Sequence, residues 1–122
     1  MTTESSTADC RCMTPPLDYR DYDRTEVGVD DTNGYYPEIS IQRCIHCSRV
    51  WLHYYIESEG YPRSGRWYRG VITPLQAESV TVAGALAILA GLSWHLYGGG
   101  HYGTTGARRD LPLDPKYVLR TS

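Results

Sequence analysis

Stretches in which apolar and polar residues alternate predict most of the secondary structure of this chain. In the segment 38–44, two isoleucines alternate with Ser40 and Gln42, which is the two-residue period of a strand with one buried face. The segment 50–57 is rich in aromatic and β-branched residues and predicts a second strand. The segment 66–73 has a similar composition and predicts a third, which we expect to pair antiparallel with the second.

A hairpin is predicted to join a short strand at 25–29 to the strand at 38–44. Asn33-Gly34 lies between them in an Asp- and Thr-containing turn, and Asn-Gly suits the positive φ angles of tight hairpins. Pro37 cannot donate a ladder hydrogen bond, which predicts an edge position for the return strand. Residues 17–24 mix tyrosines with charges and predict an irregular segment.

One helix is predicted over residues 75–91. Thr73 is placed to cap its start, and Gln76 stands at the position that completes a capping box. Gly91 fits a left-handed stop at its end. The apolar run 80–92 has thirteen residues, fewer than the ~20 that a membrane helix needs, and therefore predicts a buried core helix.

The pattern predicts an α+β domain with three to five antiparallel strands and one packed helix. Residues 93–97 predict a further strand, and 98–106 a glycine-rich loop that lacks the lysine and the following helix of a phosphate-binding loop. Residues 1–9 are polar and predict a disordered leader. We expect one zinc-stabilised domain over 10–107, followed by a tail or surface strap over 108–122.

Composition and charge change this picture in two ways. The chain has 122 residues and 41% hydrophobic residues, which allows one domain with a modest core. The net charge of −2 is uneven, because residues 1–40 sum to −6 and residues 41–122 to +4. This asymmetry predicts either an acidic interaction face or neutralisation between the two halves within the fold. No apolar stretch follows the leader, so we expect a cytoplasmic protein that neither carries a secretory signal nor enters a membrane.

Four cysteines form the strongest chemical signal. Cys10 and Cys12 make one close pair, Cys44 and Cys47 make another, and 31 residues separate the pairs. A tetrahedral Zn²⁺ needs four sulfurs that converge at about 2.3 Å, which two short turns from distant segments can supply. In a reducing compartment such spacing favours a metal over disulfides. The sequence predicts a structural Zn²⁺, since four cysteines leave no open coordination position for catalysis.

This arrangement over residues 10–47 resembles a zinc ribbon, in which two cysteine pairs arrive on β-hairpin knuckles. It departs from that pattern in its tighter first pair and in Ser48, which stands where a glycine often follows the last cysteine. Three alternatives remain open at this point. The second pair resembles the Cys-x-x-Cys of thiol oxidoreductases, the thiols could be free or disulfide-bonded, and His46 could replace one cysteine ligand.

A group of acidic and tyrosine residues near the N-terminus suggests a binding role. An acidic, tyrosine-rich segment suggests contact with a basic protein, although a solvated loop would have the same composition. Its residues are Asp18, Tyr19, Asp21, Tyr22 and Asp23. The leading hypothesis is therefore a non-enzymatic, zinc-binding interaction protein, for example an immunity or inhibitor protein for a basic effector.

The alternative function is nucleic-acid binding by arginines interleaved with aromatic residues in the region 43–69, since arginines contact phosphates and aromatic rings stack on bases. The candidate residues are Arg43, Arg49, Arg66, Trp67 and Arg69. His53, in the middle of the strand at 50–57, is predicted to be a packed side chain and not a ligand.

Overall fold

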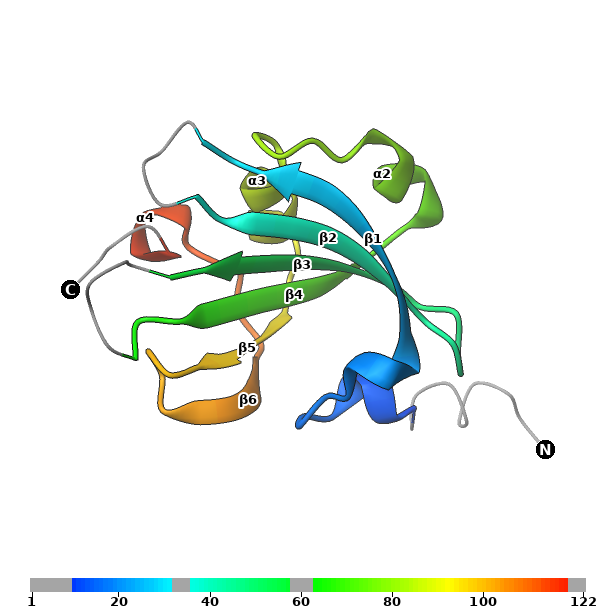
Figure 1. Ribbon diagram of the computed structural model, residues 1–122, viewed down its shortest axis with the longest axis horizontal. Helices are drawn as coiled ribbons and strands as arrows, with labels where there is room; N and C mark the ends of the chain where they lie inside the picture. Colours follow the sequence, from blue (N-terminus) through cyan, green and yellow to red (C-terminus); the bar gives the residue numbers. More distant parts are fainter. Residues whose placement is uncertain (1–9, 32–35, 58–62, 119–122) are drawn as a thin grey trace.

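A computed structural model describes residues 10–31, 36–57 and 63–118 of the chain. One antiparallel sheet of six strands forms its centre, and each strand pairs with its neighbours in sequence (Figure 1). The strands are β1 (Tyr22–Val29), β2 (Glu38–Cys44), β3 (Val50–Ile56), β4 (Arg66–Ile72), β5 (His95–Gly99) and β6 (Thr104–Arg109). Two 3₁₀ turns and three short helices accompany them: η1 (Arg11–Met13), η2 (Tyr19–Asp21), α2 (Pro74–Ser79), α3 (Ala85–Ala90) and α4 (Pro115–Val118). The α+β prediction holds in this coarse form, with more strands and more helices than expected.

The predicted hairpin is present as β1 and β2, which pair from Tyr22↔Cys44 to Val29↔Glu38. β1 starts three residues earlier than predicted, so part of the segment expected to be irregular is strand. The edge position predicted from Pro37 is wrong, because β2 pairs with β3 as well as with β1. Pro37 precedes the ladder and takes part only through its carbonyl, which accepts from Asp30 N at 3.0 Å. The predicted Asn-Gly turn lies outside the described residues.

The single helix predicted over 75–91 is instead two helices. The capping box at its start is present: Thr73 Oγ1 accepts from Gln76 N at 3.0 Å, and Gln76 Oε1 accepts from Thr73 N at 2.8 Å. The chain then leaves the helical conformation at Val80, whose ψ is 132°. β-branched residues at 80–82 and a glycine at 84 have low helix propensity, which explains the break. The left-handed stop predicted at Gly91 is also wrong, since its φ is −83°.

The glycine-rich run at 98–106 is mostly strand. β5 includes Gly99 and β6 begins at Thr104, which leaves only residues 100–103 for the turn. Downstream, Leu113 and Val118 are buried in the core, so part of the segment predicted to be a tail or strap contributes to the packing of the fold. In the described part of the chain, no helix is long and apolar enough to span a membrane.

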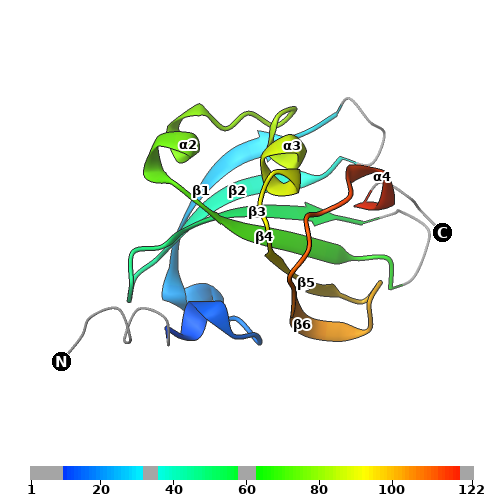
Figure 2. The ribbon, with the colours of Figure 1, turned by 180° about the vertical axis from the view of Figure 1, so that it is seen from behind.

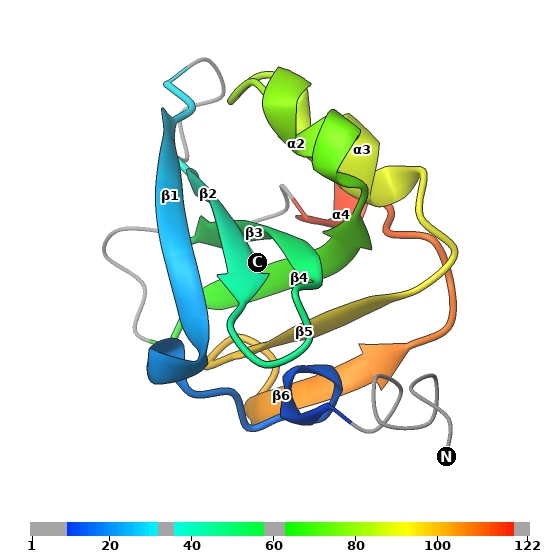
Figure 3. The same ribbon diagram turned by 90° about the vertical axis from the view of Figure 1, so that its right-hand side faces the viewer.

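The two faces of the sheet carry different cores. The helix-side face packs Leu52, Tyr54 and Ile56 of β3 together with Ala85 and Leu89 of α3. Figure 2 shows α2, α3 and α4 on this side of the sheet. The opposite face, here called the metal-side face, buries a second set of residues against the N-terminal segment (residues 10–21), which Figure 3 shows on the other side of the sheet from the helices. This set is Cys12, Tyr22, Cys44, Trp51 and Leu96.

Candidate metal centre

The four cysteine sulfurs lie together on the metal-side face. Cys10 Sγ is 3.6 Å from Cys44 Sγ, Cys12 Sγ is 3.5 Å from Cys47 Sγ, and all four lie within 4.8 Å of one another. A tetrahedron with metal–sulfur bonds of 2.3 Å has sulfur–sulfur edges of about 3.8 Å. The four thiols are free, at separations well beyond the ~2.05 Å of a disulfide bond. The cluster can therefore bind a metal ion, and a tetrahedral set of four sulfurs favours zinc or iron.

The first cysteine pair is held by the turn η1. Met13 N donates to Cys10 O at 3.0 Å and Thr14 N donates to Arg11 O at 3.2 Å, which closes the chain around Arg11. Cys12 becomes buried, with 1% of its surface exposed, while Cys10 stays partly exposed. The turn brings both sulfurs into the cluster, although only one residue separates the two cysteines.

The second pair occupies the turn between β2 and β3. Cys44 N donates to Arg49 O and Ser48 N donates to Cys44 O, each at 2.9 Å. Ser48 has a φ of 67°, the left-handed conformation that glycine adopts most easily. The departure from the ribbon pattern at this position is therefore one of residue type, and the backbone conformation is the one that glycine would take.

Hydrogen bonds around this turn point at sulfur. His46 N donates to Cys44 Sγ at 3.4 Å, and Arg49 Nη1 donates to Cys47 Sγ at 3.4 Å. Burial opposes ionisation of Cys47, but the Arg49 backbone N–H, the thiols of the first pair and the Arg49 side chain lower its pKa to about 7. Burial raises the pKa of Cys10 and Cys12. A bound cation would favour the thiolate form of all four cysteines.

Trp51 adds a buried donor next to the cysteines. Its side chain is fully buried, and its Nε1–H has no hydrogen-bond partner of normal geometry. The indole nevertheless lies close enough to Cys12 to act against the burial that raises the pKa of this thiol. An N–H beside a sulfur fits a thiolate better than a neutral thiol, because hydrogen bonds to charged acceptors are stronger.

Asp21 joins the two cysteine segments from outside the cluster. Its Oδ1 lies 2.8 Å from His46 Nε2 and accepts from Arg11 Nη1 at 3.4 Å, and its backbone carbonyl accepts from Ile45 N at 2.9 Å. The His46 ring is thus directed at Asp21, and the cluster that can hold a metal consists of the four cysteines. The His46 ring therefore contacts Asp21 and is not among the four residues that could ligate a metal, which is the alternative considered from the sequence.

The acidic, tyrosine-rich segment is largely engaged within the fold. Asp18 caps η2 and pairs with the Arg20 side chain, which lowers the Asp18 pKa to about 2. Asp21 and Tyr22 are buried, with 8% and 9% of their surface exposed. Tyr19, at 85% exposure, and Asp23 face solvent. The predicted partner-binding residues therefore do not form one continuous surface.

The arginine–aromatic set is divided between the two faces of the sheet. Arg66 is buried and donates to the carbonyl oxygens of Ser64 and Val118 at 2.8 and 3.0 Å. Arg49 bonds Cys47, as described above, and Arg43 is exposed. Trp67 and Arg69 instead share a cavity on the metal-side face, which the sequence interpretation did not foresee. The structure does not bring these five residues together on one surface.

The chain was compared with protein-family models, with curated proteins and with solved structures. None of the three comparisons finds a match. Its function must therefore be argued from the geometry of its own residues.

Proposed function

We propose that this chain is a non-enzymatic binding protein whose fold depends on a structural Zn²⁺ held by Cys10, Cys12, Cys44 and Cys47. The single observation that carries this proposal is the convergence of the four sulfurs within 4.8 Å of one another. Zinc is preferred to iron because a mononuclear set of four thiolates in a small domain is the usual form of a closed structural zinc site.

The position of the centre explains what the metal would do. It joins the N-terminal segment to the β2–β3 turn, two parts of the chain that are more than thirty residues apart. Closing such a long loop lowers the conformational entropy of the unfolded chain. Because the four ligands converge only in the folded chain, the free energy of metal binding also contributes to the free energy of folding. The same connection holds the N-terminal segment over the metal-side face of the sheet.

Support for a protein partner is narrower than the sequence suggested. Tyr19 and Asp23 remain accessible, whereas Asp18, Asp21 and Tyr22 are occupied by contacts within the fold. The prediction of a basic effector depended on all five residues acting together. Support for nucleic-acid binding is also narrower than the sequence suggested. Two of the five candidate residues in the arginine–aromatic set, Arg66 and Arg69, are buried.

Metal analysis of the purified protein, combined with thermal melting before and after chelation, tests the zinc proposal. We expect one zinc per chain, a large fall in melting temperature after chelation, and recovery when zinc is returned. Cys44→Ser should lose the metal, whereas Met13→Leu, which changes an apolar neighbour of the cluster and leaves all four cysteine thiols in place, should keep it. A metal-free protein that melts at the same temperature with and without chelator would contradict the proposal.

A further inference from the structure

A polar cavity of about 240 Å³ opens on the metal-side face, between the N-terminal segment and the strands. Its walls combine aromatic rings with groups that can bind an anion. The side chains that matter for recognition are Tyr22, Gln42, His53, Trp67 and Arg69, with Arg24 and Tyr19 at the rim. Its volume is below the ~300 Å³ at which drug-sized pockets begin, so its occupant must be small.

Arg69 is the unusual member of this wall. Only 4% of its surface is exposed, yet the one hydrogen bond that its side chain makes within the described residues runs from Nη2 to Gln42 Oε1, at 2.7 Å. Nε has no partner, and no described carboxylate lies within ion-pair distance of the guanidinium. Burying a charge with so few hydrogen-bond partners costs free energy. A bound ligand that supplies a hydrogen-bond acceptor for the guanidinium would offset this cost.

The surroundings of Arg69 hold it in place without neutralising it. Its guanidinium lies 4.5 Å from the centroid of the Tyr22 ring and 5.4 Å from that of Trp51. These contacts fix the plane of the guanidinium and leave its charge intact. Gln42, which accepts from Arg69, in turn donates to Ser40 Oγ at 3.1 Å, so the amide is oriented as well.

His53 and Trp67 supply a second donor or acceptor and a flat surface. Their rings are nearly parallel, at 22°, with centroids 6.1 Å apart. His53 Nδ1 is buried and has no hydrogen-bond partner. Trp67 is half-buried, so part of its indole faces the cavity. A planar group bound here can stack on the indole while its polar end reaches Arg69.

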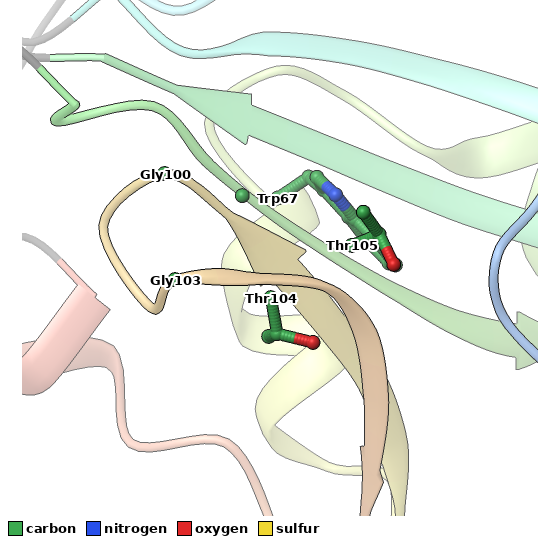
Figure 4. Close-up of a pocket in the computed structure, with 6 residues that line it drawn as sticks. Trp67, Gly100, Gly103, Thr104 and Thr105 are labelled. Atoms are coloured by element: carbon green, nitrogen blue, oxygen red, sulfur yellow. The ribbon is translucent and has the colours of Figure 1, made fainter.

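A larger trough lies beside the β5–β6 turn and shares part of its lining with the cavity. Trp67 and Thr105 line both spaces, and Gly100 and Gly103 border the trough at the turn (Figure 4). A Cβ atom on Gly98 would lie only 2.8 Å from the Trp67 indole, which shows how closely β5 packs against this ring.

We propose that this cavity binds a small planar monoanion, an aromatic or heteroaromatic carboxylate, with its carboxylate on Arg69 and His53 and its ring on Trp67. One negative charge matches the site, because Arg24 pairs with Glu26 at the rim and no described carboxylate pairs with Arg69. The proposal rests on the metal centre only in that zinc holds the N-terminal wall in place.

Titration calorimetry of the zinc-loaded full chain tests this assignment, with benzoate and nicotinate as probes. Benzamide keeps the ring without the charge, cyclohexanecarboxylate keeps the charge without the flat ring, and inorganic phosphate is a non-planar anion. We expect both planar carboxylates to bind at least about tenfold more tightly than these three, the scale of one charge-assisted hydrogen bond. Equal binding of benzoate and benzamide, or of benzoate and phosphate, would overturn the assignment.

Variants locate the site. Arg69→Met and Trp67→Leu should each weaken benzoate at least about fivefold, while Arg43→Met, which removes an exposed arginine outside the cavity, should leave its affinity unchanged. Because Arg69→Met could fail to fold, the wild type is also titrated by NMR. The His53 ring and Trp67 indole signals should shift, whereas those of Trp94, which does not line the cavity, should not. Shifts confined to other residues, or absent binding, would contradict the proposal. Zinc content measured on the same samples separates this failure from a failure of the metal centre.

Discussion

Asp21 and His46 lie 2.8 Å apart through Oδ1 and Nε2, and this contact fastens the start of β1 to the turn that carries the second cysteine pair. The same Asp21 oxygen accepts from Arg11, inside the first pair. One buried carboxylate thus orients both halves of the candidate metal centre. Partners of this kind, one step removed from the metal, commonly change metal affinity when they are removed.

Asp21→Ala should weaken zinc binding by roughly 10- to 100-fold while leaving all four sulfurs in the chain. Competition with a chromophoric chelator measures this directly. Asp23→Ala is the matched control, because Asp23 lies two residues away with its side chain exposed. Equal affinities for the two variants would show that the Asp21 contacts do not support the centre.

Ser48→Gly should stabilise the zinc-loaded protein by about 1 kcal/mol, since a non-glycine residue at a φ of 67° is strained. Denaturant unfolding under reducing conditions with excess zinc measures the change. Ser79→Gly makes the same chemical change in helix α2 and should lower stability by about 0.5 kcal/mol. If both variants shift in the same direction, the conformation assigned to Ser48 is wrong.

Gly99→Ala should cost about 2–4 kcal/mol and Gly103→Ala only about 1 kcal/mol. Both glycines have positive φ, at 114° and 68°. A Cβ atom on Gly99 would lie 2.5 Å from Gly65 O and 2.8 Å from Arg66 Cα, whereas one on Gly103 would meet nothing within 4 Å. Paired thermal melts of the two variants separate the clash from the strain of φ, and equal losses would refute the close packing at Gly99.

Acid should destabilise the fold partly through His53. Burial, with help from Arg69 and Arg24, lowers the pKa of His53 to about 3 from an ordinary value of 6.5. Between these values the unfolded chain binds a proton that the folded chain does not, so stability falls as the pH drops from about 6.5 toward 3. One such proton contributes at most about 1.4 kcal/mol per pH unit.

His53→Asn removes this titration and should flatten the dependence of unfolding free energy on pH below 6.5. Metal release at low pH affects both proteins, so the quantity to compare is the difference between wild type and variant at each pH. The difference in unfolding free energy between wild type and His53→Asn should change steadily as the pH falls. Parallel curves would mean that His53 titrates alike in the folded and unfolded states.

The sequence predicted β2 closely from its alternation of apolar and polar residues, and β3 and β4 from their aromatic and β-branched composition, which suits a buried sheet. It did not predict the break between α2 and α3, since an apolar run can satisfy a core in more than one conformation. Composition at 80–84 contained a signal in its β-branched residues and glycine, but the capping box at Thr73 and Gln76 favoured one continuous helix. Local chemistry fixed the start of α2 and not its length.

The cysteine cluster was predictable because the residue type and spacing of four cysteines indicate metal binding. The Asp21–His46 contact and the cavity around Arg69 were not, since both depend on strand register. Gln42 and Arg69 are 27 residues apart in sequence, and only the pairing of β2, β3 and β4 brings their side chains within 2.7 Å. The sequence feature that could have indicated this cavity is the presence of polar residues, such as Gln42 and Arg69, at strand positions that face a core.

X-ray absorption at the zinc edge of the protein as purified under reducing conditions tests the central claim most directly. We expect one zinc per chain, with four sulfur scatterers at about 2.3 Å and no nitrogen or oxygen among the atoms bound to the metal. A first shell that contains histidine nitrogen or water oxygen, or a chain that carries no zinc, would contradict it.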